Sequence, residues 1–352
     1  MLNFFLCFLT SFLIAFASIP SIIRIANRLS LFDEPNERKI HNNRIPLLGG
    51  IAIFAASLFS FTIWAAPYFE SQHLFIIAAL IIIFFFGLRD DIAPLAPLKK
   101  LSGQVIASLI VVLYCNIRLS GLHGLFGIHS LSWISSVLWT VFAMLFIINA
   151  FNLIDGIDGL SSGLGIISSF VFGILFFVYG DFLMSVLAFS LCGALFGFIP
   201  FNFYKARIFM GDTGTMTTGF ILALLSVHFM ELSREVTVTS WFSYYSAPTL
   251  VLSALIIPVI DMMRVFIIRI IRLRSPFSAD RNHIHHRLMM LGLNPAQACI
   301  ILYMINILFV IAAWVFRDRN AVTVFYVFMF SAFILTQLPQ LWLMIKKKKQ
   351  IA

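Results

Sequence analysis

Five aspartates lie in short segments beside long apolar runs of the sequence. Asp90 and Asp91 end the segment GLRDD, Asp155 and Asp158 belong to NLIDGIDGL, and Asp212 belongs to MGDTGT. A carboxylate near hydrocarbon is costly unless a cation or hydrogen bonds compensate it. Hard oxygen ligands suit Mg²⁺, which keeps several waters and takes substrate phosphates. These acids therefore indicate metal-assisted chemistry at a membrane surface.

The pair Asp90 and Asp91 follows an uninterrupted apolar run. Two adjacent carboxylates repel each other unless a cation lies between them. They could act as metal ligands or as a base beside a metal ion. The structural alternative is that one of them caps the next helix, ahead of Pro94 and Pro97. Because two acids occur together, we expect a catalytic role.

The segment NLIDGIDGL separates two apolar runs of membrane length. If it forms a helical turn, the spacing of Asp155 and Asp158 puts both on one face. Gly156 and Gly159 allow a backbone or a ligand to approach closely, and Asn152 adds a neutral oxygen ligand. The segment therefore predicts part of a Mg²⁺ site.

Asp212 lies in a glycine-rich turn that leads into the next apolar run. Backbone N–H groups at a helix start attract anions, while the aspartate can hold a cation. A loop cap is the structural alternative for a single acid of this kind.

Basic and histidine residues accompany the acids in DEPNERKIHNNRIPLLGG, ARIFMGDTGT and DRNHIHHRL. Lysine and arginine bind phosphate oxygens, although positive charge beside a span also sets its orientation. Three histidines could bind zinc, but without a nearby cysteine we favour contacts with phosphate or sugar hydroxyls. The candidates for substrate binding are Lys39, Arg44, Arg207, His283, His285, His286 and Arg287.

The composition identifies the class of protein. Of the 352 residues, 61% are hydrophobic and 11% are charged, against roughly 45–50% and about 25% in soluble domains. Mean hydropathy is +1.00. We therefore expect one polytopic membrane domain over residues 1–352, with lipid as its main solvent. The net charge of +9 follows from membrane topology, and no nucleic-acid partner is expected.

The apolar segments predict an all-α fold of about eleven transmembrane helices, because a span needs about 20 apolar residues. The expected spans are 2–23, 47–66, 73–88, 101–117, 131–150, 161–179, 182–200, 215–230, 245–268, 297–315 and 321–345. We interpret the first as a retained span because its first basic residue, Arg24, follows the apolar run. The four cysteines lie in apolar runs without CxxC spacing, so we expect buried thiols.

The basic residues predict the orientation in the membrane. All but four of the 24 lysines and arginines fall on one side of the predicted spans. The positive-inside rule then places the N-terminus outside and the C-terminus in the cytoplasm. The five aspartates fall on the cytoplasmic side, and the catalytic loops there are expected at about 24–46, 89–100, 151–160, 201–215 and 269–296.

In this order, GLRDD, NLIDGIDGL, ARIFMGDTGT and HIHH resemble the polyprenyl-phosphate N-acetylhexosamine-1-phosphate transferases, over nearly the whole chain. The segments RKIHNNRIPLLGG and HIHHRL are similar to the WecA/TagO-like branch of glycosyltransferase family 4 rather than to the related MraY.

The resemblance implies an enzyme that transfers a sugar 1-phosphate, by default GlcNAc-1-phosphate, from a UDP-N-acetylhexosamine to undecaprenyl phosphate. UMP is released on the cytoplasmic face of the bacterial inner membrane, as the first membrane step of a cell-surface polysaccharide. Other UDP-N-acetylated deoxy sugars and UDP-MurNAc-pentapeptide are alternative donors. Attack could be direct or pass through an aspartyl intermediate. Homodimers occur in the family.

The resemblance also implies residue roles. Asp90 and Asp91 match the catalytic pair, and Asp212, Asp155 and Asn152 match the residues around Mg²⁺, with Mn²⁺ as an alternative metal. Asp158 matches the motif that lines the nucleotide and metal site, and His285 and His286 match the phosphate-contacting histidines. The full set of substrate-binding candidates is Asp158, Lys39, Arg44, Arg207, His283, His285, His286 and Arg287.

The main alternative from another class is a proton- or cation-coupled transporter. Transporters tend to place ionisable residues near the bilayer midplane, on broken helices in paired repeats. No clear internal symmetry is visible, and Asp261 reads as the partner of Arg264 in an i, i+3 ion pair near the inner surface. A transferase is therefore the favoured interpretation.

Overall fold

The computed structural model describes residues 2–29, 32–33, 45–235, 247–273 and 282–351, with side chains up to residue 345. Lys39 and Arg44 lie outside these ranges. The main elements are α1 (Leu2–Leu29), β1 (Phe32–Asp33), β2 (Ile45–Pro46), α2 (Gly49–Trp64), α3 (Leu74–Ile92), α4 (Pro97–Tyr114), α5 (Trp133–Ile154), α6 (Leu160–Tyr179), α7 (Phe182–Asn202), α8 (Gly211–Glu235), α9 (Ala247–Ala254), α10 (Ile256–Ile271), α11 (Ile284–Met290), α12 (Pro295–Val315) and α13 (Ala321–Ile351).

Each predicted span overlaps one α-helix, except that 245–268 overlaps both α9 and α10, and α11 lies outside the predicted spans. Within the described ranges, nine are long and apolar enough to cross a membrane. A tenth candidate is the pair α9 and α10, bent by 81° at its break, and α2 is a shorter apolar helix of 16 residues. The only strands described are β1 and β2, a two-residue antiparallel pair. The prediction of an all-α polytopic membrane protein is confirmed.

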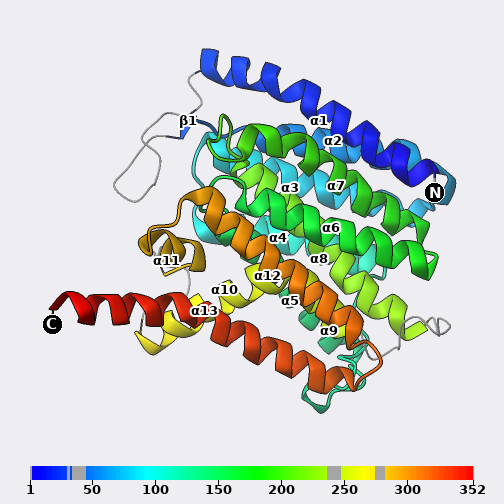
Figure 1. The fold of residues 1–352 in the computed structure, drawn as a ribbon. Coiled ribbons are helices and arrows are strands. Elements are labelled where there is room, and N and C mark those ends of the chain that lie inside the picture. The colour runs from blue at the N-terminus through cyan, green and yellow to red at the C-terminus, as the bar shows by residue number, and fades with distance from the viewer. Residues whose placement is uncertain (1, 30–31, 34–44, 236–246, 274–281, 352) are drawn as a thin grey trace.

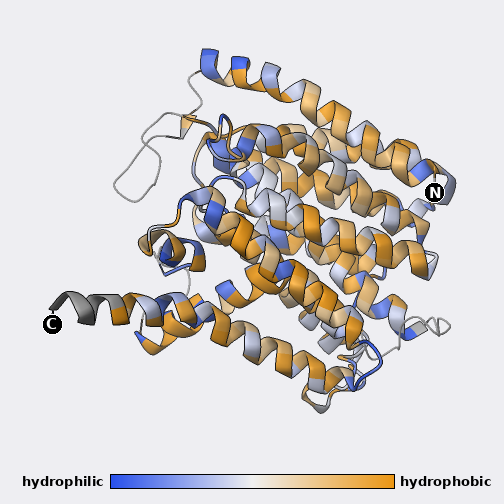
Figure 2. Ribbon diagram, in the orientation of Figure 1, coloured by the Kyte–Doolittle hydropathy of each residue, from blue (hydrophilic) through white to orange (hydrophobic). Residues whose placement is uncertain are grey.

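The helices run side by side, and the two chain ends lie at opposite ends of the bundle (Figure 1). Apolar residues cover the middle of the helices, and hydrophilic residues concentrate near their ends (Figure 2). This distribution is expected when the middle of each helix contacts hydrocarbon. Which end faces the cytoplasm stays a prediction.

Helix α8 lies at the centre of the bundle. Its apolar window is 83% buried, against 22% for α1 and for α13, so the latter two are peripheral. The start of α8 touches its neighbours without intervening side chains: a Cβ at Gly50 of α2 would lie 2.1 Å from the amide nitrogen of Gly214. A Cβ at Gly87 of α3 would lie 2.6 Å from Cα of Thr213. Small residues permit such approach in membrane helices, and here they fix the position of the GDTG segment.

The bend between α9 and α10 has a local cause. Pro258 has no N–H to donate to the carbonyl of Ala254, four residues earlier. The hydroxyl of Ser168 on α6 donates to that carbonyl at 2.7 Å, and Asn306 Nδ2 on α12 donates at 3.4 Å. The bend is therefore held by two neighbouring helices, and it directs α10 toward α11 and α13.

The four cysteines are free and buried, as the sequence predicts. Gly193 on α7 packs against the backbone of Phe8 on α1, where a Cβ would lie 2.2 Å from the carbonyl oxygen. Cys7 on α1 contacts Ser190 Oγ on α7 at 2.9 Å, between the same two helices. Cys7 is therefore part of the packing of α1 on α7.

Candidate active site

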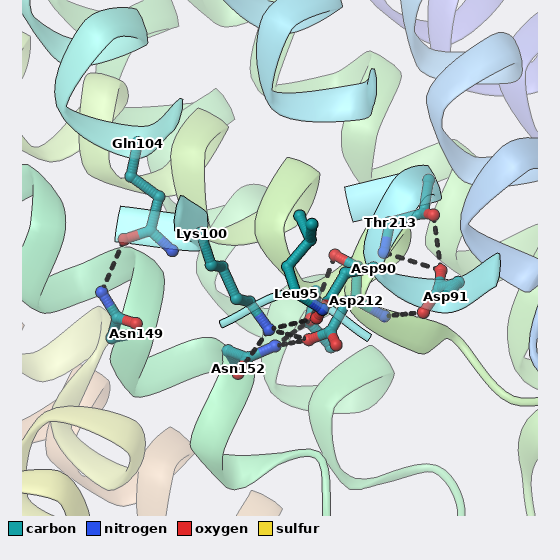
Figure 3. Close-up of polar contacts among 10 residues, drawn as sticks. Asp90, Asp91, Leu95, Lys100, Gln104, Asn149, Asn152, Asp212 and Thr213 are labelled. Atoms are coloured by element: carbon teal, nitrogen blue, oxygen red, sulfur yellow. Dashed lines mark hydrogen bonds and ion pairs between the residues drawn. The ribbon is translucent and has the colours of Figure 1, made fainter. Parts of the chain in front are cut away.

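Four polar side chains from four helices converge at one end of the bundle (Figure 3). Lys100 Nζ on α4 donates to Asp90 Oδ2 on α3 at 3.1 Å and to Asp212 Oδ1 on α8. It also lies 3.5 Å from Asn152 Oδ1 on α5. Asn152 Nδ2 donates to Asp212 Oδ1 and, at 2.8 Å, to the hydroxyl of Thr215. Three motifs far apart in sequence thus form one cluster, which we name the lysine centre: Asp90, Lys100, Asn152 and Asp212.

Local structure places each member of the lysine centre at a helix end. Asp90 lies in the last turn of α3, and its Oδ1 accepts the N–H of Leu95 at 2.5 Å in the turn to α4. Lys100 lies in the first turn of α4, which begins at Pro97. One turn later on α4, Gln104 Oε1 accepts a hydrogen bond from Asn149 Nδ2 at 2.7 Å. This bond connects α4 to α5 about one turn before Asn152. The side chains of Asp90, Lys100 and Asp212 are 10%, 16% and 29% exposed, so each is partly accessible to solvent.

From the sequence, Lys100 was not identified as a candidate site residue. It was used only as one of the basic residues that set the orientation in the membrane. A lysine four residues before a glutamine, at the start of an apolar run that follows two acids, was the available signal in the sequence. Its ammonium group compensates the carboxylates of Asp90 and Asp212, which would otherwise repel each other.

Asp91 has a different environment from its neighbour. Its Oδ1 accepts the N–H of Asp212 at 2.6 Å, and its Oδ2 accepts the N–H and the hydroxyl of Thr213 at 2.9 and 2.5 Å. Asp91 therefore caps the N-terminus of α8 from another helix. The two adjacent acids point to different partners (Figure 3). A helix cap was the structural alternative for this pair, and the helix capped is α8. The catalytic role of Asp91 stays a prediction.

The acids of NLIDGIDGL do not lie on a helix. Helix α5 ends at Ile154 and α6 begins at Leu160. Asp155 Oδ1 accepts from the hydroxyl of Ser161 at 2.5 Å, and Asp158 Oδ2 accepts the N–H of Ala206 at 2.9 Å. The condition for a shared helix face is not met, because residues 155–159 form a non-helical turn between the two helices. Burial raises the pKa of Asp155 to about 7, and the charges of Asp212 and Asp158 act in the same direction.

The histidine segment lies against this turn. His285 is 1% exposed, and a Cβ at Gly156 would lie 2.2 Å from its Nε2. The rings of His283 and His285 stack at 5.6 Å, and those of His285 and His286 lie 4.2 Å apart. Burial, followed by the charge of His286, lowers the pKa of His285 well below its usual value, so this imidazole is neutral at physiological pH. HIHH and NLIDGIDGL thus form a second part of the site.

The remaining basic candidates lie in separate places. Arg207 stacks its guanidinium over the ring of Phe201 at 4.8 Å and, with Arg24, lines a cavity of about 690 Å³ between α1 and α7. Arg287 is buried in α11 and its Nη1 lies 3.4 Å from Gln337 Oε1 on α13. The structure therefore places Arg207 beside α1 and Arg287 beside α13.

The metal prediction can be compared with the donors present. Among the described residues, no group of three or more His, Cys, Asp or Glu side chains could hold a metal ion. The lysine centre does gather two carboxylates and an amide oxygen around a cationic nitrogen. This donor set fits a hard cation such as Mg²⁺, and the metal site stays a prediction.

Comparisons with known proteins support the same interpretation. Residues 73–230 match the family described as Glycosyl transferase family 4. A Bacillus subtilis protein named probable undecaprenyl-phosphate N-acetylglucosaminyl 1-phosphate transferase is 31% identical over 95% of this chain and 91% of its own length. A Mycobacterium leprae decaprenyl-phosphate N-acetylglucosaminephosphotransferase is 32% identical over 84% and 79%. An Escherichia coli O157:H7 undecaprenyl-phosphate alpha-N-acetylglucosaminyl 1-phosphate transferase is 30% identical over 79% and 74%. The chain therefore belongs to glycosyl transferase family 4 and is a multi-pass membrane transferase.

Proposed function

We propose that the chain transfers N-acetylglucosamine 1-phosphate from UDP-N-acetylglucosamine to undecaprenyl phosphate, releasing UMP on the cytoplasmic face of the bacterial inner membrane. The relatives support this reaction, since their names specify polyprenyl phosphates and N-acetylglucosamine 1-phosphate. The observation that carries the proposal is the convergence of Asp90, Asn152 and Asp212 on Lys100 at helix ends.

The position of the lysine centre suits this pair of substrates. A polyprenyl tail cannot leave the bilayer, whereas a nucleotide sugar is soluble in water. The reacting phosphates therefore meet where spanning helices end. Asp90, Lys100 and Asp212 each lie within a turn of such an end, so both substrates can reach them.

The proposed reaction exchanges one phosphorus–oxygen bond for another. An oxygen of the acceptor phosphate forms a bond to the sugar-bearing phosphorus of the donor. The bond from that phosphorus to the bridging oxygen breaks, and UMP leaves with the electron pair. Catalysis of this kind depends on positioning and on neutralising charge.

The side chains of this protein have distinct roles in that reaction. Asp90 orients the acceptor phosphate and takes its proton if one is present. Lys100 places a positive charge beside the phosphates. Asp91 holds the first turn of α8, which keeps Asp212 in place. His283, His285, His286, Arg287 and Asp158 contact the donor near the NLIDGIDGL turn, and Lys39, Arg44 and Arg207 contribute further positive charge.

We include Mg²⁺, replaceable by Mn²⁺, in the proposal. Asp212, Asp155 and Asn152 would hold it, beside Asp90. When bound, the metal neutralises the negative charge of the diphosphate.

The proposal is tested by offering the purified protein undecaprenyl phosphate and a panel of nucleotide sugars: UDP-N-acetylglucosamine, UDP-N-acetylgalactosamine and UDP-MurNAc-pentapeptide. We expect UMP release and a lipid-linked sugar diphosphate with the first donor, and loss of both on adding EDTA. UMP release from another donor alone would change the sugar assignment. No UMP from any donor with Mg²⁺ present would refute the reaction.

The orientation is tested with single cysteines in a variant that lacks the four native ones. Leu98→Cys lies at the end of the bundle with the lysine centre, and Phe126→Cys lies at the other end; the native side chains are 79% and 69% exposed. We expect a membrane-impermeant thiol reagent added to whole spheroplasts to label only position 126. Labelling of position 98 from outside would overturn the orientation.

A further inference from the structure

Asp261 on α10 is a buried carboxylate outside the lysine centre. It is 1% exposed, and Arg264, one turn later, is fully buried. Arg264 Nη2 donates to Asp261 Oδ1 at 2.7 Å, which confirms the ion pair predicted from the i, i+3 spacing. A buried pair of this kind needs further hydrogen bonds to offset the loss of water.

Those further bonds reach the histidine segment. Asp261 Oδ1 accepts the N–H of Ile284 at 2.9 Å, and Asp261 Oδ2 accepts from His283 Nδ1 at 2.8 Å. Arg264 Nη2 also donates to the carbonyl of Asn282. Three consecutive residues at the start of α11 are thus held by one ion pair on α10. The pair fixes α11 as well as stabilising its own helix.

The contact continues from His283 to the proposed donor site. The His283 ring stacks on His285 with an interplanar angle of 11°, and His285 packs on Gly156, next to Asp155. Both ring nitrogens of His285 are buried and, within the described part of the chain, have no hydrogen-bond partner. Buried polar atoms are rarely left unpaired, so a ligand at the NLIDGIDGL turn is the natural partner.

The bond to Asp261 also defines the chemistry of His283. A carboxylate that accepts from Nδ1 keeps the proton on that nitrogen. The Nε2 of a neutral His283 is then an acceptor. An amide at position 261 could present its N–H₂ group instead, and the ring would have to move its proton to Nε2.

We propose that Asp261 is a positioning residue of the transferase: with Arg264, it fixes the tautomer of His283 and holds His285 against the NLIDGIDGL turn, where the donor phosphates bind. The proposal rests on the proposed function.

The first test compares two aspartates that each pair with a histidine. In Asp261→Asn we expect kcat for UMP release to fall by about tenfold to a hundredfold, the range typical of residues that orient others. In Asp261→Glu we expect partial recovery, because the carboxylate is kept. The control is Asp181→Asn, which removes an Asp–His pair of 2.7 Å at the other end of the bundle, and its kcat should stay within about twofold. Equal kcat in Asp261→Asn and the control would overturn the proposal.

A second test separates positioning from general stability. His283→Asn keeps a donor in the place of Nδ1, whereas His283→Ala removes it, so the Asn variant should retain more activity. Adding Asp261→Asn to His283→Ala should lower kcat little further, because both changes break one interaction. Fully additive losses would contradict a role through His283.

A third test needs no catalysis. Amide hydrogen exchange on the whole protein in detergent should be faster over residues 282–290 in Asp261→Asn than in wild type and Asp181→Asn. Unchanged exchange there would refute the positioning role even if wild type released no UMP. If wild type released no UMP while exchange did respond, only the proposed reaction would fail.

Discussion

The two ends of the bundle contain Asp–His pairs of nearly equal length with different surroundings. At one end, Asp181 Oδ2 lies 2.7 Å from His228 Nε2, and Asp181 Oδ1 caps α7 by accepting the N–H of Met184 at 3.0 Å. At the other, Asp261 pairs with His283 at 2.8 Å and supports His285, whose ring nitrogens have no partner in the described chain. Asp181 and His228 thus form a pair that also caps a helix. Asp261 and His283, in contrast, lie beside a histidine whose ring nitrogens have no hydrogen-bond partner among the described residues.

The same contrast holds for the other acids. Glu231 accepts both the N–H of Ser120, at 2.9 Å, and its hydroxyl. In the lysine centre, by contrast, Asp90, Asn152 and Asp212 share the single ammonium group of Lys100. A cavity of about 490 Å³ is also lined by Asp181 and His228, with Glu70 and His73 among its other polar residues. A hydrogen-bonded acid and a cavity therefore do not identify a site, whereas the lysine centre is distinguished by three side chains that share one ammonium group.

The largest effect is expected at Asp212. Asp212→Asn keeps the shape but removes a charge from the lysine centre, and we expect UMP release to fall about a thousandfold, as for the loss of a key electrostatic group. The matched change at the other end, Asp181→Asn, should leave the rate within about twofold. Retention of more than a tenth of wild-type activity would remove Asp212 from the metal site.

Lys100→Met should have the next largest effect, about a hundredfold on activity, because the acids lose their shared cation and the phosphates lose a positive charge. The control is Lys99→Met, which removes a neighbouring exposed lysine. We expect no more than a twofold change there. Similar losses in both variants would assign Lys100 to orientation in the membrane rather than to the site.

Asp91→Asn should have a smaller effect, of about tenfold on activity, with a stability loss of about 1–2 kcal/mol from the weakened cap of α8. Asn294→Ala removes another cap, whose Oδ1 accepts the N–H of Gln297 at 2.9 Å on α12. Its stability should fall similarly without loss of activity. If Asp91→Asn abolished activity, Asp91 would act directly in the reaction.

The smallest expected effect is on the stability of the folded protein at low pH, through Asp181 at the end of the bundle opposite the lysine centre. Burial raises the pKa of Asp181, but the hydrogen bond and the charge of His228 outweigh burial and lower this pKa below 3.8. The charge of His73 lowers the pKa further. Glu70 lines the same cavity. The folded carboxylate then binds protons less tightly than the unfolded one. Its stabilisation is present above about pH 3.8 and is lost as the pH falls through the folded pKa.

Thermal unfolding between pH 3 and pH 6 checks this expectation. The unfolding temperature should fall more steeply with acidification in wild type than in Asp181→Asn. Asp318→Asn, which changes a carboxylate that is 71% exposed, should follow wild type. Parallel curves for wild type and Asp181→Asn would contradict the assignment.

Much of the fold was predictable because the bilayer imposes a length and a composition on each span. The bend at Pro258 and the shortness of α2 were not, since hydropathy does not report direction. The motifs identified Asp90, Asn152 and Asp212 through their residue types. Lys100 escaped because a lysine near a membrane surface is usually topological. The different partners of Asp90 and Asp91 depend on tertiary packing, which sequence spacing does not contain.

The contact between Gly50 and Gly214 limits which residues of α2 and α8 can be substituted without moving Asp212. Main-chain atoms of α2 and α8 meet there directly, so the height of Asp212 along the bundle, relative to α2, is set by backbone dimensions. Lipid-facing side chains can then be exchanged to match bilayers of other thickness while the acid keeps its height. A single added methyl group at Gly50 would lie 2.1 Å from the amide nitrogen of Gly214 and would force the two helices to shift.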